Sequence, residues 1–325
     1  MPVDATVIQN AAATTYPALI IYIVYVVICV ALFSFLIRAI LKRYSLKVNA
    51  AIILLILSSN IFIFEVLERG NSVLIVTVLL LAAIYLKDSQ KPSYREIALI
   101  LIAVAAGFKI YPALFGVLYI HERRIKEGVR LLIYGILLFF VPFVFFGGWS
   151  GMINFFTNQV QVQSLEYASI YCVKSTVRHF ASVFTGDVFA YDTLATVLQI
   201  IFIAINIIPV FMKRVFSWER VLLLCAIIAF GPAWSGGYTS IFFVIPMVMF
   251  FSKSYNTFMM LSSRIKDNFI ALCFAMTFCL NMFVLPSGFV VETLSSVPMY
   301  AIDFIVIGSI IYRTVSKKSG TVVDI

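Results

Sequence analysis

The sequence has little charge and few residues suited to metal or nucleotide chemistry. Asp, Glu, Lys and Arg make up 12% of the 325 residues, and there are only two histidines. The five cysteines have no spacing typical of a metal site or a disulfide framework. The motifs GxxxxGK[ST] and HExxH are absent, which argues against ATP hydrolysis and zinc proteolysis. We therefore expect no metal and no cofactor.

Apolar residues fill most of the chain instead. They make up 62% of the sequence, and the mean hydropathy is +1.05. Long apolar runs recur and are flanked by charge, which is typical of a polytopic helical membrane protein. The runs are continuous, whereas the strands of a membrane barrel alternate. The sequence therefore predicts an all-α fold, with residues 1–325 forming a single integral membrane domain.

We expect about 11 membrane segments, two pairs of which are interrupted. Residues 97–120 are broken by Gly107–Pro112, and residues 221–251 are broken by Gly231–Tyr238. Both flanks of each pair are basic, so a straight span would put one basic loop on the wrong side. Each pair therefore predicts a re-entrant or short-helix hairpin. The apolar segments are residues 16–37, 48–64, 72–86, 97–108, 112–120, 131–146, 194–212, 221–231, 239–251, 269–285 and 298–312.

These hairpins produce a strongly asymmetric distribution of positive charge. Loops 38–47, 87–96, 121–130, 213–220 and 252–268, together with the C-terminal tail, hold 20 of the 24 Lys and Arg residues. Such loops face the cytoplasm, so the net charge of +9 needs no nucleic-acid partner. We expect a plasma membrane protein of bacterial type with a cytoplasmic C-terminus. Residues 147–193 would form an extracytoplasmic loop region.

The other face gathers the unusual polar residues. Glu65, Glu68, Arg69 and Asn71 lie together in FEVLERGNSVLI, residues 64–75. They fit either a helix-end cap or a site for an anionic, oxygen-rich ligand, because Arg binds phosphate and Glu and Asn bind sugar hydroxyls.

The two hairpin tips carry further candidates. Lys109 is either a lysine reaching for water or a cation held at a helix break to pair with a phosphate. Trp234 and Tyr238 form either part of an aromatic belt or a stacking platform for a sugar or an isoprenoid.

Three ordered motifs resemble glycosyltransferase family 87. They are Tyr16-Pro17-Ala18-Leu19, Glu68-Arg69-Gly70-Asn71 and Gly107-Phe108-Lys109-Ile110-Tyr111-Pro112. The resemblance implies a GT-C-like fold and transfer of a hexose, commonly mannose, from a polyprenyl-phosphate donor. The acceptor would be a lipid-linked or cell-surface glycan on the extracytoplasmic side, and membrane lipids would surround the chain.

The resemblance also implies roles for particular residues. Arg69 and Lys109 would hold the donor phosphate, because a lipid phosphate leaves more readily beside positive charge. Glu65, Asn71, Tyr111, Trp234 and Tyr238 would shape the sugar or lipid pocket. One carboxylate would act as general base on the acceptor hydroxyl.

The identity of this base is where the sequence departs from the family. The family carries a catalytic Asp after an initial transmembrane helix, and that helix is not found here before Tyr16. Asp4 is the corresponding candidate, Glu65 or Glu68 could substitute for it, and the base could also precede Met1. A transporter or flippase for a lipid-linked glycan, or a truncated and non-catalytic homologue, are the alternative interpretations.

Overall fold

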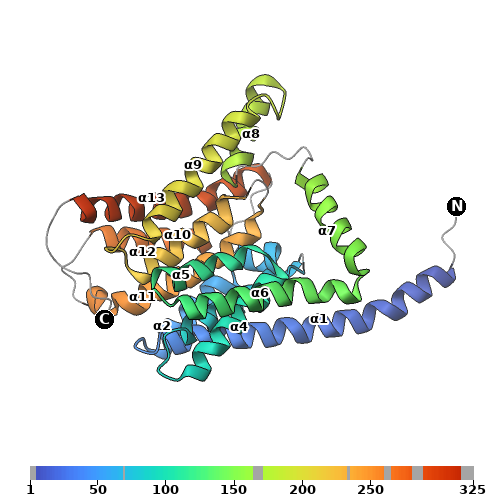
Figure 1. The fold of residues 1–325 in the computed structure, drawn as a ribbon, viewed down its shortest axis with the longest axis horizontal. Coiled ribbons are helices and arrows are strands. Elements are labelled where there is room, and N and C mark those ends of the chain that lie inside the picture. The colour runs from blue at the N-terminus through green and yellow to red at the C-terminus, as the bar shows by residue number, and fades with distance from the viewer. Residues whose placement is uncertain are drawn as a thin grey trace.

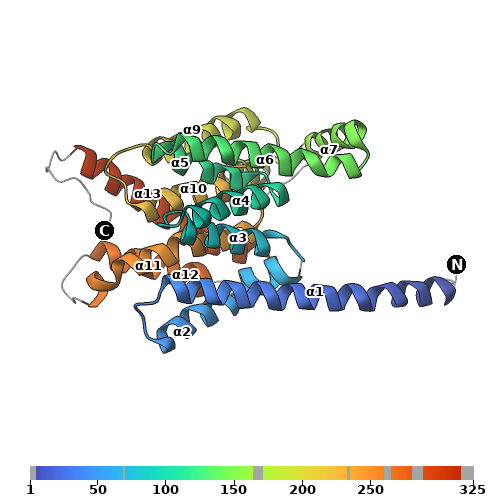
Figure 2. The same cartoon turned by 60° about the horizontal axis from the view of Figure 1, so that its bottom comes forward.

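The computed structural model describes residues 5–68, 70–163, 171–232, 235–259, 265–279 and 288–315, and these are helical with no strand among them. Figure 1 shows the helices packed as a bundle, and Figures 1 and 2 both show the N-terminal part of α1 extending beyond it. The α-helices are α1 (Ala5–Ile40), α2 (Leu46–Leu57), α3 (Val73–Leu86), α4 (Pro92–Phe108), α5 (Gly116–His121), α6 (Ile125–Phe145), α7 (Gly148–Gln163), α8 (Val173–Thr185), α9 (Asp192–Val210), α10 (Ser217–Phe230), α11 (Val244–Met259), α12 (Ile265–Cys279) and α13 (Gly288–Val315). A π-helix, η1 (Ile61–Glu68), and two 3-10 helices, η2 (Tyr111–Phe115) and η3 (Gly237–Phe243), interrupt this series.

Two apolar helices, α3 and α10, form the centre of the bundle. Every residue of α10 after Ser217 is buried, as are most residues of α3. A helix that is apolar on all sides needs partners on all sides. Accordingly, α10 packs against α9, α11 and α13, and α3 packs against α1 and α4. The all-α prediction is confirmed for the described residues.

The expected number of about 11 membrane segments is not confirmed. Among the described residues, four helices are long and apolar enough to cross a membrane: Tyr16–Ile40, Ile125–Phe145, Asp192–Val210 and Ser296–Val315. A fifth crossing is obtained if Leu46–Leu57 and Ile61–Leu67, which are bent by 51°, count as one span. Apolar runs alone do not fix the number of crossings, because a helix buried in protein, such as α10, is as apolar as one that faces lipid.

The first predicted hairpin is present. The chain breaks between α4 and η2, and the two basic flanks meet at one end of the bundle. Lys87 lies 2.5 Å from Glu122, and Arg124 lies 3.2 Å from Asp88. We call this end, formed by residues 87–96 and 121–130, the basic end. The first arm is longer than its apolar run, since α4 begins at Pro92, a residue favoured in the first turn of a helix.

The second predicted hairpin is present too. The described part of the chain breaks between α10 and η3, and the chain then returns through α11. The flanks meet where the Trp218 and Phe250 rings pack edge to face, with centroids 4.9 Å apart. Residues 147–193, expected as a loop region, carry the helices α7 and α8.

A buried ion pair joins the start of α10 to the end of α13. The Arg313 guanidinium lies 2.5 Å from Glu219, which is fully buried and also accepts a bond from the Phe216 amide. We expect Arg313→Met to destabilise the protein by about 3 kcal/mol, because it leaves a buried carboxylate without its cation. Thermal unfolding in detergent measures this loss. The double variant Glu219→Gln/Arg313→Met should recover most of the stability, and a double variant as unstable as Arg313→Met would contradict this explanation.

Candidate functional site

The π-helix η1 ends in a tight turn at Gly70 and Asn71. The Gly70 amide bonds to the Leu67 carbonyl at 2.9 Å, and the Asn71 amide bonds to the Val66 carbonyl at 3.1 Å. This pair of bonds is a Schellman motif, and Gly70 has the positive φ of +57° that the motif favours. The Asn71 side-chain oxygen accepts from the Val73 amide at 3.2 Å and so caps α3. For Gly70 and Asn71, the structure agrees with the helix-cap interpretation.

Lys109 occupies the break between α4 and η2. Its backbone is extended, with φ −146° and ψ 127°, so the helix ends there. The half-buried ammonium lies 5.5 Å from the centre of the Tyr238 ring, a cation–π distance. Among the described residues, Lys109 has no carboxylate within ion-pair distance, so its charge is not neutralised there.

Glu65, on η1, lies against the second hairpin tip, next to the Tyr238 ring that Lys109 contacts. A Cβ atom placed on Gly237 would lie 3.3 Å from the Glu65 carboxyl carbon, so this carboxyl packs directly on the backbone beside Tyr238. Glu65 thus reaches the second hairpin tip from η1, while Lys109 reaches it from the first. The structure therefore brings Glu65 and Lys109, two of the polar residues expected on one face, to the same hairpin tip.

Tyr171 is a component of the site that the sequence did not reveal. Its ring is buried, and its hydroxyl lies 2.5 Å from the Ser240 hydroxyl and accepts from Thr239 at 3.2 Å. The Tyr300 hydroxyl donates to the Tyr171 carbonyl at 3.0 Å. Tyr171 therefore fixes the start of η3, where Gly237 and Tyr238 lie.

Tyr111 adds an unsatisfied polar group. Its ring packs edge to face on Phe242, with centroids 5.6 Å apart. Its hydroxyl oxygen is buried and has no hydrogen-bond partner within the described part of the chain. A buried hydroxyl left unpaired is costly, and such groups in native structures often await a ligand or water.

Several predicted residues cannot be placed in this arrangement. Asp4, Arg69 and Trp234 lie outside the described residues, and for Glu68 the structure gives the backbone of η1 only. Their roles stay predictions.

The polar cluster of α8 and α9 has a structural explanation. Arg178 and Lys174 both pair with Asp192, at 2.7 and 3.2 Å. Their charges are therefore compensated, whereas Lys109 has no carboxylate partner in the part of the chain that the structure describes.

The comparison with protein families can now be set beside this geometry. A sequence profile of glycosyltransferase family 87 matches residues 11–235. The chain belongs to glycosyltransferase family 87. No curated protein and no solved structure matches it. Glu65 and Lys109 fall within the part matched by family 87, whereas Tyr238 lies just beyond it. The resemblance predicted from the sequence motifs is confirmed, and membership indicates a membrane glycosyltransferase.

The contact between Gly237 and Glu65 gives a test of the site. We expect Gly237→Ala to lower glycosyl transfer by about tenfold, because the new methyl group displaces the Glu65 carboxyl and small misplacements of reacting groups are costly. Gly308→Ala is the matched control, because a Cβ atom at Gly308 meets nothing within 4 Å. Initial rates in membranes with equal amounts of protein measure the effect. Equal activity of the two variants would contradict a role for Glu65 in glycosyl transfer.

Proposed function

We propose that this family-87 chain is a GT-C-type hexosyltransferase of the bacterial cell membrane. It transfers mannose from a polyprenyl-phosphate donor to a lipid-linked or cell-surface glycan on the extracytoplasmic face. The main support is Lys109, a half-buried cation at a helix break that has no carboxylate partner in the described structure. An uncompensated cation at such a depth is expensive unless an anion binds it. The donor phosphate supplies that anion.

The remaining roles follow from the chemistry of transfer. Lys109, with Arg69, holds the phosphate and stabilises the charge that it gains on leaving. Tyr111 and Tyr238, with Trp234 and Asn71, border the sugar. The buried Tyr111 hydroxyl supplies a hydrogen bond that a sugar or phosphate oxygen can satisfy.

We assign the general base to Glu65, in preference to Glu68 and Asp4. The Glu65 carboxyl packs on Gly237, next to the tyrosine that contacts Lys109. It would take the proton of the acceptor hydroxyl. The acceptor oxygen then bonds to the anomeric carbon as the bond from that carbon to the phosphate oxygen breaks, and polyprenyl phosphate leaves with the bonding electrons.

Sugar transfer from radiolabelled polyprenyl-phosphate mannose tests the proposal. Membranes containing the chain should form labelled glycolipid and release polyprenyl phosphate, and the variant Lys109→Met should not. Movement of labelled lipid between leaflets without release of polyprenyl phosphate would indicate a flippase. Binding of the donor with neither outcome would indicate a non-catalytic homologue.

A further inference from the structure

A basic turn joins two segments that are long and apolar enough to cross a membrane. They are Tyr16–Ile40 of α1 and the bent pair formed by α2 and η1. Helices α1 and α2 pack against each other, and Figure 2 shows them side by side along one edge of the bundle. We call residues 38–47 the α1–α2 turn. A turn between two spans lies at a membrane surface, among the lipid headgroups.

The α1–α2 turn carries four cations and no acidic residue. The cations are Arg38, Lys42, Arg43 and Lys47. All four are exposed, and within the described structure none has a carboxylate at ion-pair distance. No Asp or Glu occurs anywhere in residues 5–64. A basic cluster beside a membrane-crossing helix is typical of binding to anionic lipids.

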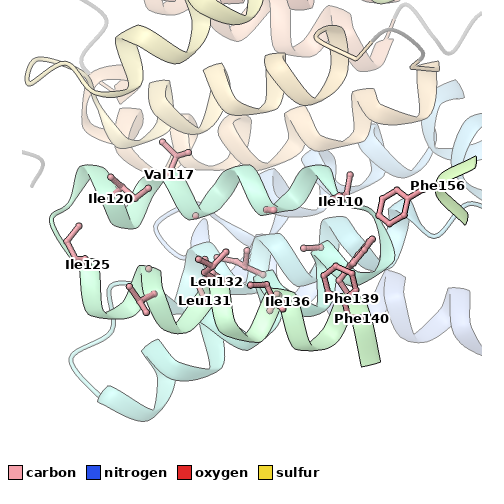
Figure 3. A pocket seen from close by; sticks show the side chains of 18 residues that line it. Ile110, Val117, Ile120, Ile125, Leu131, Leu132, Ile136, Phe139, Phe140 and Phe156 are labelled. Atoms are coloured by element: carbon pink, nitrogen blue, oxygen red, sulfur yellow. The ribbon is translucent and has the colours of Figure 1, made fainter. Parts of the chain in front are cut away.

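The basic end differs from the α1–α2 turn. Its seven Lys and Arg residues are interspersed with four carboxylates. Four of these seven cations pair with them: Lys87, Arg95, Arg124 and Arg130. Figure 3 shows the cavity of about 780 Å³ between η2–α5 and α6, whose lining is apolar, so it offers no partner to an anion. Uncompensated positive charge is therefore more concentrated at the α1–α2 turn.

The backbone of the α1–α2 turn is held in place by its neighbours. The Tyr44 hydroxyl donates to the Phe251 carbonyl on α11 at 3.0 Å. The buried Asn49 side chain donates to the Leu41 carbonyl at 3.3 Å, which ties α2 to the turn. Because the backbone is already ordered, binding a phosphate there costs little further conformational entropy.

Exposed apolar side chains adjoin the cations on both helices. On α1, Phe35 lies one turn before Arg38 and is 65% exposed. On α2, Leu46 directly precedes Lys47 and is 63% exposed. Positive charge thus adjoins apolar surface, as phosphate adjoins acyl chains in a phospholipid. A free phosphate ion would use only the charge.

We propose that the α1–α2 turn binds the headgroup of an anionic phospholipid, whose phosphate is held by the cations of the turn. Ammonium and guanidinium groups donate charge-assisted hydrogen bonds to phosphate oxygens. The lipid belongs to the leaflet that the turn faces. Binding is independent of the proposed function, because this lipid is neither the donor nor the acceptor of the sugar.

The bound lipid also holds η1 through α2. Helix α2 passes into η1 at Ser59, whose buried hydroxyl donates to the Ile56 carbonyl at 2.6 Å and accepts from the Phe62 amide at 3.2 Å. Helix η1 carries Glu65 and packs against η3. An opening that moves α2 away from the headgroup therefore also disturbs η1.

Native mass spectrometry of the purified full-length protein tests the proposal, with phosphatidylglycerol and phosphatidylcholine as probes. We expect phosphatidylglycerol to bind more tightly by about 100-fold or more, since each Lys or Arg contributes roughly fivefold. Equal binding of the two lipids would overturn the proposal. Displacement of phosphatidylglycerol by an equal concentration of inorganic phosphate, or of a polyglutamate peptide, would overturn the choice of a phospholipid.

Two triple variants locate the site. Lys42→Gln/Arg43→Gln/Lys47→Gln should lower the affinity for phosphatidylglycerol by about 100-fold, and Lys42→Arg/Arg43→Lys/Lys47→Arg, which keeps the charge, should restore it. The matched control Lys91→Gln/Arg123→Gln/Lys126→Gln removes three exposed cations of the basic end and should stay within about twofold of wild type. Equal losses in the two glutamine variants would mean that binding follows net charge, and would overturn the site.

Hydrogen exchange gives a readout that needs no variant. Phosphatidylglycerol at about ten times its Kd should slow exchange in residues 38–68 of the wild-type protein by about tenfold, because openings that release the lipid become rarer in that proportion. Exchange in residues 87–130 should keep its rate. Slowing confined to residues 87–130, or no slowing in residues 38–68, would overturn the proposal.

Discussion

Lys109→Met should lower kcat for sugar transfer by about 100- to 1000-fold, the typical effect of removing one group that stabilises transition-state charge. Methionine keeps much of the length and apolar volume of the lysine side chain but removes its charge. The donor phosphate then leaves beside the Tyr238 ring without the Lys109 charge. Lys109→Arg should retain part of the activity, because it restores the charge in a different shape. Steady-state rates at saturating donor measure these effects.

Lys91 offers a matched control for this variant. Its ammonium lies 5.3 Å from the centre of the Tyr94 ring, so it makes the same kind of cation–π contact at the basic end. Lys91→Met should leave transfer within about twofold of wild type, as expected for an exposed charge distant from the reaction. Equal losses in the two variants would mean that Lys109 matters for folding or insertion, and a fully active Lys109→Met would reject its role with the phosphate.

Glu65→Gln should lower kcat by about 100- to 10,000-fold, the contribution typical of a general base. The amide nearly matches the shape of the carboxyl, so packing against Gly237 is preserved, but it cannot accept a proton from the acceptor. Donor binding should remain, since Lys109 is untouched. The same transfer assay, combined with binding of radiolabelled polyprenyl-phosphate mannose to the variant, separates catalysis from binding.

Glu68→Gln and Asp4→Asn decide between the three carboxylates. Both should keep near-wild-type rates if Glu65 is the base. A large loss in Glu68→Gln with an active Glu65→Gln would move the base to the end of η1. A large loss confined to Asp4→Asn would instead support the position that the family resemblance implies.

Most of the helices could be predicted because they correspond to continuous apolar runs in the sequence. The basic flanks of residues 97–120 also revealed the first hairpin, since positive charge marks one side of a membrane. The number of crossings could not be predicted in this way. Helix α10 is buried by protein, and apolarity alone does not distinguish that environment from lipid.

The site was predictable only in part, for a related reason. Lys109 and Glu65 are conspicuous because they are charged residues beside apolar segments. Tyr171 is not, because its role depends on a bond to Ser240, which is 69 residues away in the chain. The π-helical form of η1 likewise has no marker in its sequence, although it sets the direction in which Glu65 points.

The bond from Tyr300 has a consequence for the order in which this protein matures. Tyr300 lies on α13, its ring stacks on Phe230 at 4.1 Å, and its hydroxyl holds the Tyr171 carbonyl. A chain emerging from the ribosome carries Glu65, Lys109 and Tyr238 long before it carries this helix. Tyr171, which fixes the start of η3, therefore lacks its hydrogen bond from Tyr300 until α13 is inserted. The protein should thus become able to bind its donor only late in biosynthesis.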